Sequence, residues 1–311
     1  MADKILITGA SGSLGRLLVK HFLGREPIIG VDRRPFMGRP MDLEFYQIDL
    51  RKKKAENLFR RESIRAVYHL DVQHSPRMSP MELHQRNVRT TMKLLEYCER
   101  YQVPKLVFLS TSNVYGANPL NPNFLSEDAP LAAGTDNAFM ATLIEAEMYV
   151  MTYLWRRPEM QVVILRPVHI VGPSVHNPLS NYLRLRRVPT VMGFDPLLQL
   201  IHEDDVIHAL ALAGQPGAHG IYNIVGPGLV PLSVILRELG ARHYSVPGPL
   251  LRTMIRRLWK RRLFPIAPAE LNFLQFVCNV DGARAAKDLG FKPHYSLQET
   301  IRSLRSPRAG I

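Results

Sequence analysis

Short apolar runs alternate with segments of helical spacing along the first half of the chain. The apolar runs are KILIT (residues 4–8), PIIGVD (27–32), EFYQID (44–49), IRAVYHLD (64–71) and KLVFLST (105–111). Between them, RLLVKHFL (16–23), a segment from Lys54 to Glu62 and a long segment from about Met81 to Arg100 show the pattern of helices. Strands that alternate with helices in this way predict βαβ units, and therefore a parallel, doubly wound α/β sheet.

The first predicted strand leads directly into a glycine-rich turn, TGASGSLG, and then into a predicted helix. Gly9 permits a tight turn, Gly12 lets backbone N–H groups approach a pyrophosphate, and Gly15 lets the helix pack close to the strand. The turn therefore predicts a dinucleotide site at the start of the helix. Its other predicted contact residues are Thr8, Ser11, Ser13 and Leu14.

The second predicted strand ends in Asp32, 17 residues after Gly15. A carboxylate at this place would accept hydrogen bonds from both adenosine ribose hydroxyls of NAD. Arg33 and Arg34 follow, and their guanidinium groups could instead bind the 2′-phosphate of NADP. Because Asp32 would repel that phosphate, the sequence favours NAD over NADP as the cofactor.

The composition is that of an ordinary globular chain. Of its 311 residues, 46% are hydrophobic and 22% are charged, and no repeat or low-complexity linker separates independent modules. No stretch reaches the roughly 18 apolar residues of a membrane span, and the first residues contain no signal core, so we expect a cytoplasmic protein.

Metal-ligating residues do not occur at the spacings that metal sites require. Cys98 and Cys278 stand alone among apolar neighbours, and the histidines of the second half (His169, His176, His202 and His208) are scattered. We therefore expect no metal site, and we expect the acidic residues after His202 to be structural, with Asp204 as a helix N-cap.

The net charge of +13 is concentrated in the second half of the chain. Residues 1–150 contain 20 Lys and Arg against 17 Asp and Glu, whereas residues 151–311 contain 20 against 10. Residues 249–264 (PLLRTMIRRLWKRRLF) predict an amphipathic basic helix, which could pack as a surface helix, lie on an anionic membrane surface or bind phosphate-bearing ligands. No nucleic-acid-binding module is present, so we expect no specific nucleic-acid partner.

Further motifs follow the glycine turn in a characteristic order. They are STSNVYG (110–116), ILRPVHIVGP (164–173), QLIHEDDV (199–206), IYNIVGPG (221–228) and DGARAAKDLGFKP (281–293). With these motifs the chain resembles an extended short-chain dehydrogenase/reductase of the NAD-dependent epimerase/dehydratase type, from Lys4 to about Ile301. The resemblance implies a Rossmann-like domain at 1–166 with 197–213 returning to it, and a smaller mixed substrate-side domain made of 167–196 and 214–311.

The resemblance also implies which residues lie near the cofactor. In the family an acid after the third strand holds the adenine, and Asp49 with Leu50 matches it here. Strand VYHL, ending in Leu70, matches the strand below the nicotinamide. The resemblance further places Asp71, Asn87 and Pro167 beside the cofactor.

Family chemistry depends on a tyrosine and a lysine four residues later on one helix, which together transfer the substrate proton. The family's Glu-Ala-Glu, here residues 145–147, places Phe139 at the tyrosine position and Leu143 at the lysine position. The only Tyr-x-x-x-Lys, at residues 101–105, contains Pro104, which breaks a helix. Of the family's four catalytic positions, Thr111 keeps its hydroxyl and Asn87 its amide.

Two further departures concern the substrate side. Asp71 stands where the family usually has a small residue, and it could act as a substitute base, repel a ligand or cap the following loop. The Arg-Asp-Tyr of nucleotide-sugar epimerases is replaced by residues 198–200, Leu-Gln-Leu, which argues against the usual recognition of a nucleoside diphosphate sugar.

The chain therefore resembles a bacterial subgroup of the family in which dinucleotide binding persists without the full set of catalytic residues. The first hypothesis is an NAD-binding protein with a binding, sensing or scaffold role, an unknown small-molecule ligand and a homodimeric assembly. The second is an atypical NAD-dependent epimerase, dehydratase or reductase. The third is a protein peripheral to the inner membrane surface through residues 249–264.

Overall fold

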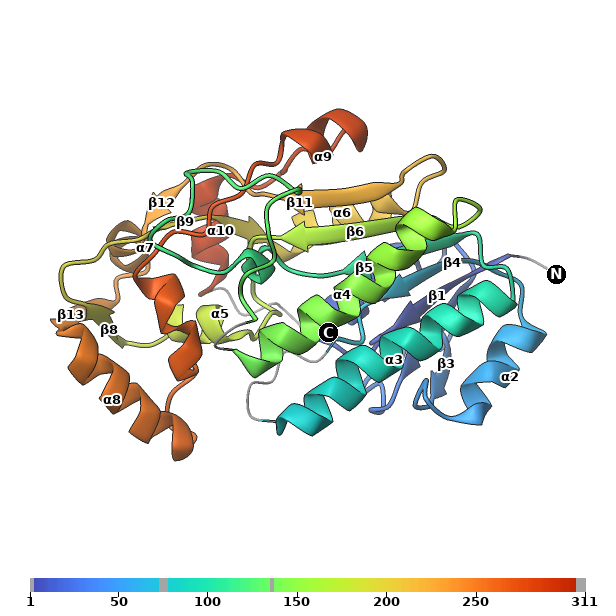
Figure 1. Cartoon of the computed structure of the whole chain (residues 1–311), viewed down its shortest axis with the longest axis horizontal. Helices are drawn as coiled ribbons and strands as arrows, with labels where there is room; N and C mark the ends of the chain where they lie inside the picture. Colours follow the sequence, from blue (N-terminus) through green and yellow to red (C-terminus); the bar gives the residue numbers. More distant parts are fainter. Residues whose placement is uncertain (1–2, 73–77, 135–136, 306–311) are drawn as a thin grey trace.

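A computed structural model describes residues 3–72, 78–134 and 137–305, and within them seven parallel strands form one central sheet (Figure 1). The strand order is β11-β6-β5-β4-β1-β2-β3, which confirms the predicted doubly wound sheet. The strands are β1 (Lys4–Thr8), β2 (Ile28–Asp32), β3 (Glu44–Gln47), β4 (Ile64–His69), β5 (Lys105–Leu109), β6 (Gln161–Pro167) and β11 (Gly220–Ile224).

Helices cover both faces of this sheet. In the view of Figure 1, α2, α3 and α4 lie in front of the sheet and α6 lies behind it, where α1 packs against α6. Their bounds are α1 (Ser13–Phe22), α2 (Lys53–Arg61), α3 (Pro80–Arg100), α4 (Ala138–Arg156) and α6 (Glu203–Ala213). Because both faces are covered, β1, β2 and β5 are buried almost throughout, which explains why their sequences are continuous apolar runs.

The predicted helices lie close to their observed bounds because local signals fix their ends. α3 begins at Pro80 after a capping box in which the Ser79 side chain accepts from the backbone of Glu82. α6 differs from the expectation in its cap. It begins at Glu203, and the N-cap is His202, whose Nδ1 accepts from the backbone N–H of Asp204 at 3.2 Å. Asp204 therefore lies in the first turn, where a negative charge suits the positive end of the helix dipole.

A second apolar core lies beside the sheet and includes Tyr182, Leu236, Leu251 and Ile255. The elements of this half are β7 (His169–Val171), α5 (Pro178–Leu183), β8 (Arg187–Val191), β9 (Leu197–Leu198), β10 (Leu200–His202), β12 (Val230–Pro231), α7 (Leu232–Glu238), β13 (Arg242–Val246), α8 (Gly248–Lys260), η2 (Pro268–Leu274) and α10 (Leu297–Ser303). Residues 214–311 do not all belong to this half. β11 pairs with β6, which would otherwise be an edge strand, and α9 (Ala283–Asp288) packs on β11.

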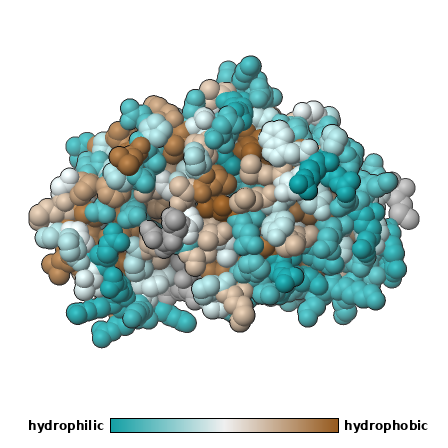
Figure 2. All heavy atoms as spheres, in the orientation of Figure 1, coloured by the Kyte–Doolittle hydropathy of each residue, from teal (hydrophilic) through white to brown (hydrophobic). Residues whose placement is uncertain are grey.

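The basic helix α8 lies at the end of the molecule away from the N-terminus (Figure 1), where Figure 2 shows projecting hydrophilic side chains. Leu251 and Ile255 are fully buried in the second core, and Met254 and Leu258 pack against it. The apolar face on which insertion into lipid would depend is thus occupied by the protein itself. No helix in the described part of the chain is long and apolar enough to cross a membrane.

Candidate functional site

A cavity of about 340 Å³ opens where β1, β4 and β5 end at their carboxyl edges. In open parallel sheets this edge is where ligands bind, because the connecting loops there diverge to the two faces. One wall is the glycine turn with the first residues of α1. The predicted residues that line the cavity are Gly9, Gly12, Ser13, Leu14, Gly15, Leu70, Asp71, Thr111 and Phe139.

The geometry of the glycine turn requires glycine at two positions. Gly9 has a φ of +71°, and a Cβ there would lie 2.8 Å from the backbone of Leu70 and Asp71. A Cβ on Gly15 would lie 2.2 Å from the carbonyl oxygen of Gly9. At Gly12, the N-cap of α1, a Cβ would meet that oxygen at 3.2 Å, and no side chain caps the helix there. The start of α1 thus presents backbone N–H groups and a positive dipole end to the cavity.

Asp32 is held in place at the end of β2. Its carboxylate accepts from the backbone N–H of Ser11 at 3.1 Å and of Arg34 at 2.9 Å. The guanidinium of Arg34 lies 3.4 Å from the same carboxylate and lines the cavity, whereas Arg33 does not. Arg34 is therefore paired with the buried carboxylate of Asp32, while 59% of its own side chain stays exposed to solvent.

The remaining predicted cofactor residues are not among the described residues that line the cavity. Asp49 is 2.6 Å from Arg51, whose side-chain hydrogen bonds hold the pKa of Asp49 below its usual range. Leu50 is buried in the sheet core. Thr8 hydrogen-bonds His69 at 2.7 Å, and burial lowers the pKa of His69 to about 3, so this histidine is neutral. Asn87 and Pro167 also lie outside the described cavity lining, and the Asn87 amide donates to Thr142 at 3.1 Å.

The wall where family members carry their acid is apolar. Phe139, in the first turn of α4, lines the cavity with 5% of its surface exposed, and Leu143 is buried one turn further on. Thr111 lines the cavity and accepts from the backbone N–H of Asn113 at 3.3 Å. Neither tyrosine nor lysine occurs among the described residues that line this cavity.

The far wall contains polar residues that the sequence did not single out as a site. His169 and Glu270 lie among apolar residues that include Ile266, Phe273 and Leu274. Burial lowers the pKa of His169 to about 4 and raises the pKa of Glu270 to about 7. Glu270 accepts from the backbone N–H of Ala267 at 2.8 Å in the first turn of η2, and no motif in the sequence marks it as a site residue.

A buried polar network fixes α4 against β6 beside the cavity. Arg166 lies 2.5 Å from Glu147 and donates to the hydroxyl of Tyr115 at 2.7 Å. Ser110 also donates to Glu147, and Tyr115 donates to Asn223 on β11 at 2.8 Å. Since Arg166 and Glu147 are almost completely buried, their mutual pairing sets the position of α4 and hence of Phe139.

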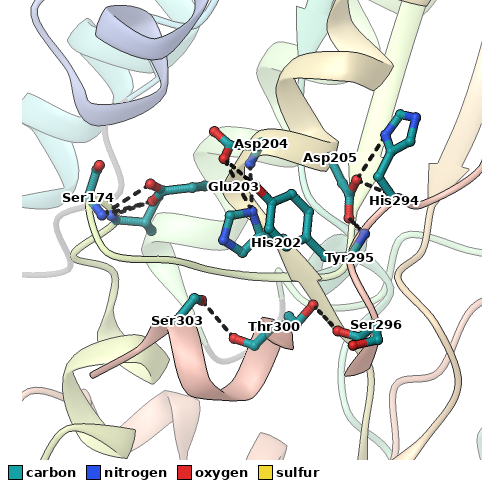
Figure 3. A network of polar contacts seen from close by, with 11 residues as sticks. Ser174, His202, Glu203, Asp204, Asp205, His294, Tyr295, Ser296, Thr300 and Ser303 are labelled. Carbon is teal, nitrogen blue, oxygen red and sulfur yellow. Dashed lines mark hydrogen bonds and ion pairs between the residues drawn. The ribbon is translucent and has the colours of Figure 1, made fainter. Parts of the chain in front are cut away.

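The acidic cluster after His202 also has a structural role (Figure 3). Glu203 accepts from the backbone N–H groups of Ser174 and Val175, both at 2.9 Å. Asp205 accepts from the backbone N–H of His294 at 2.8 Å and lies fully buried. These bonds join the first turn of α6 to two loops that come from distant parts of the sequence. No group of three metal-ligating side chains occurs within the residues that the structure describes.

Comparison with known proteins decides the family. The family model described as "NAD dependent epimerase/dehydratase family" matches residues 5–225. The chain belongs to this family. Membership confirms the resemblance inferred from the motifs, and the family description agrees with NAD as the expected cofactor.

Several known proteins are similar to nearly the whole chain. An uncharacterized protein of Mycobacterium tuberculosis is 29% identical over 308 residues, which cover 96% of this chain and 82% of that protein. The UDP-glucuronate 4-epimerase of Thermodesulfobacterium geofontis is 26% identical over 323 residues, with 96% and 93% covered. The solved UDP-glucose 4-epimerase of Thermus thermophilus, in complex with NAD, superposes with a TM-score of 0.78 at 22% identity over 99% and 100% of the two chains.

Proposed function

We propose that this epimerase/dehydratase family member binds NAD in the cavity but lacks the family's proton-transfer pair, and that it serves as a binding, sensing or scaffold protein. The observation that carries the proposal is that apolar side chains occupy both positions of the pair on α4: Phe139 lines the cavity, and Leu143 is fully buried one turn further on. A benzyl and an isobutyl group can exclude water, but they cannot donate or accept a proton.

The residues present fit NAD. Gly9, Gly12 and Gly15 leave the space and the backbone N–H groups that a pyrophosphate needs, and Asp32 would accept from the adenosine ribose. When bound, NAD supplies a hydride acceptor or, once reduced, a hydride donor. Phe139 and Phe273 would shield that reaction face from water.

One observation favours the alternative, an atypical epimerase, dehydratase or reductase. Glu270 places a carboxyl group on the far wall, and a pKa of about 7 leaves it divided between its acid and base forms at neutral pH. Asp71 is less well placed for this role, because its backbone lies against Gly9 on the pyrophosphate side of the cavity.

Titration calorimetry with NAD and NADH tests the first proposal. We expect binding by the wild type and none by Gly12→Asp, because the new carboxylate would occupy the pyrophosphate position and repel it. The unfolding temperature of the variant serves as the control for folding. Absence of NAD(H) and NADP(H) binding by the wild type up to millimolar concentration would refute the proposal.

Hydride exchange with UDP-glucose and simple alcohols separates the two alternatives. Without a phenol at position 139 we expect rates at least ~10²-fold below those of a family member that carries the tyrosine. Turnover at ordinary enzyme rates would instead support the atypical enzyme. In that case Glu270→Gln and Asp71→Asn show which carboxyl group transfers the proton.

A further inference from the structure

A second hollow, of about 700 Å³, lies next to the NAD cavity and is named here the α8 groove. The first residues of α3 and α4 form one side, including Pro80, Asn137 and Phe139. The other side is formed by α8 and η2, which lie together at the far end of the molecule from the N-terminus (Figure 1).

The α8 side of the groove is basic. Arg252, Arg256 and Trp259 are spaced four and three residues apart, so they share one face of the helix. Arg252 donates to the side chain of Asn272 at 3.3 Å, which directs its guanidinium along the groove. No aspartate or glutamate is among the described residues that line the groove, and the positive end of α4, whose first turn holds no acidic residue, faces it. The electrostatic environment therefore favours an anion.

The helix that carries the two arginines is anchored in the second core. Leu251 and Ile255, on the adjacent face of α8, are fully buried in the second core. Arg257 and Arg261 belong to the same basic stretch but are not among the described residues that line the groove. Two arginines of this basic stretch, Arg252 and Arg256, therefore line the groove, and Arg257 and Arg261 do not.

The groove adjoins the NAD cavity through one residue. Phe139 lines both, and η2 contributes Ala269 and Asn272 to the groove but Glu270 to the cavity. A ligand held in the groove would therefore lie against the same aromatic ring that closes the NAD cavity.

We propose that the α8 groove binds the phosphate or pyrophosphate group of an ester, with Arg252 and Arg256 as its ligands and an apolar body of the ester packed toward Phe139. A phosphate ester of this kind would be the small-molecule ligand of the proposed NAD-binding protein, so this inference rests on the proposed function.

The body of the ester is assigned as apolar from the rest of the lining. Besides the arginines, the described lining contains two polar side chains, Asn272, which accepts from Arg252, and Asn137, which caps α4. The other lining side chains are apolar and include Met78, Pro80, Leu83, Ala138, Trp259 and Pro268. Sugar hydroxyls packed on such a surface would lose hydrogen bonds to water without replacement. Guanidinium groups bind phosphate oxygens well, and hydrocarbon packs well on the remaining walls.

Calorimetry with inorganic pyrophosphate and with geranyl pyrophosphate, on protein saturated with NAD, tests the proposal. NAD occupies the glycine turn, so the added pyrophosphate reports on the groove alone. We expect both to bind, the geranyl ester more tightly, and Arg252→Gln/Arg256→Gln to weaken both by about tenfold for each arginine removed. Trp259→Ala should weaken the geranyl ester and leave inorganic pyrophosphate unchanged.

The matched control is Arg257→Gln/Arg261→Gln, which removes the same charge from the same basic stretch outside the groove. It should change the affinity at physiological ionic strength by less than about threefold, because exposed charges there are screened. An equal loss in both double variants would overturn the proposal. So would a wild type that ignores both esters yet sediments with anionic vesicles, which would assign α8 to a membrane surface instead.

The Gly12→Asp variant separates this inference from the proposed function. If the wild type binds NAD but neither ester, the groove assignment fails and NAD binding stands. If no form binds NAD while Gly12→Asp still binds geranyl pyrophosphate through Arg252 and Arg256, the NAD proposal fails and the groove remains a phosphate-ester site.

Discussion

Glu270 places an ionisable carboxyl group in the wall of the NAD cavity, and its protonation is coupled to folding. Burial disfavours the charged form and raises the pKa to about 7, whereas the group titrates near 4.5 in the unfolded chain. The folded state therefore binds this proton more tightly. Linkage then requires that the free energy of unfolding falls as the pH rises from about 4.5 through about 7.

Glu270→Gln removes this pH dependence. The amide oxygen can still accept from Ala267, but no charge has to be buried. We expect thermal unfolding to be unchanged at pH 4 and to shift upward at pH 8, by on the order of 2 kcal/mol, or about 4 °C.

Glu299→Gln is the matched control with the opposite sign. Glu299 is exposed, and hydrogen bonds from Ser296 lower its pKa, so the stability it contributes is present above pH 4.5 and is lost in acid. Identical pH profiles for the wild type and Glu270→Gln would contradict the assigned burial.

Part of the candidate site could be predicted from the sequence. Glycine at 9 and 15 is dictated by contacts with the adjoining backbone, so the sequence carries that geometry directly. The position of Phe139 at the cavity was predictable from the family resemblance, which places it at the tyrosine position by counting back from residues 145–147. Glu270 was not, because no motif marks it in the sequence, and only tertiary packing brings it to the cavity that His169 also lines.

At the scale of elements, α8 shows why a basic amphipathic pattern does not by itself indicate lipid binding. The spacing of Leu251 and Ile255 suits either insertion into a membrane or packing on a core, and in this structure both side chains are buried in the second core. The strands of the first half were easier to predict, since a parallel sheet covered on both faces requires continuous apolar runs.

Leu251→Ala tests whether α8 is anchored in this way. Leu251 is 0% exposed, so its truncation should lower the free energy of unfolding by about 2–5 kcal/mol, measured by chemical denaturation. Leu250→Ala is the matched control, because the neighbouring leucine is 61% exposed and its loss should change stability by less than about 0.5 kcal/mol. Equal effects of the two substitutions would mean that α8 does not pack on the core as described.

Over the whole molecule, the two cores are joined by segments whose placement the sequence leaves open. β11 closes the exposed edge of β6, although it lies in the part of the chain expected on the substrate side. β6 and β11 are more than 50 residues apart in the sequence, and they pair because the outer edge of β6 is left unpaired by the other strands of the sheet. No local pattern in GIYNI (220–224) carries that information.

Helix α4 exposes a stripe of large side chains with apolar surface to solvent in the folded molecule. Met148, Tyr149 and Trp155 on α4 are exposed, and Met148 and Trp155, seven residues apart, share one stripe of the helix. Trp155 is 74% exposed, which is unusual for so large an apolar side chain. In a twofold dimer the same stripe would meet itself, so each copy would cover the other.

We therefore expect a homodimer that α4 holds together. Light scattering coupled to size-exclusion chromatography should give about twice the chain mass of 35.4 kDa for the wild type and the single-chain mass for Trp155→Glu, because a buried, unpaired carboxylate would oppose association. Phe124→Glu, at another exposed aromatic position outside α4, should leave the dimer intact. A monomeric wild type would leave Trp155 facing water and would show that this face has no role in self-association, while NAD binding, which depends on the glycine turn, would be unaffected.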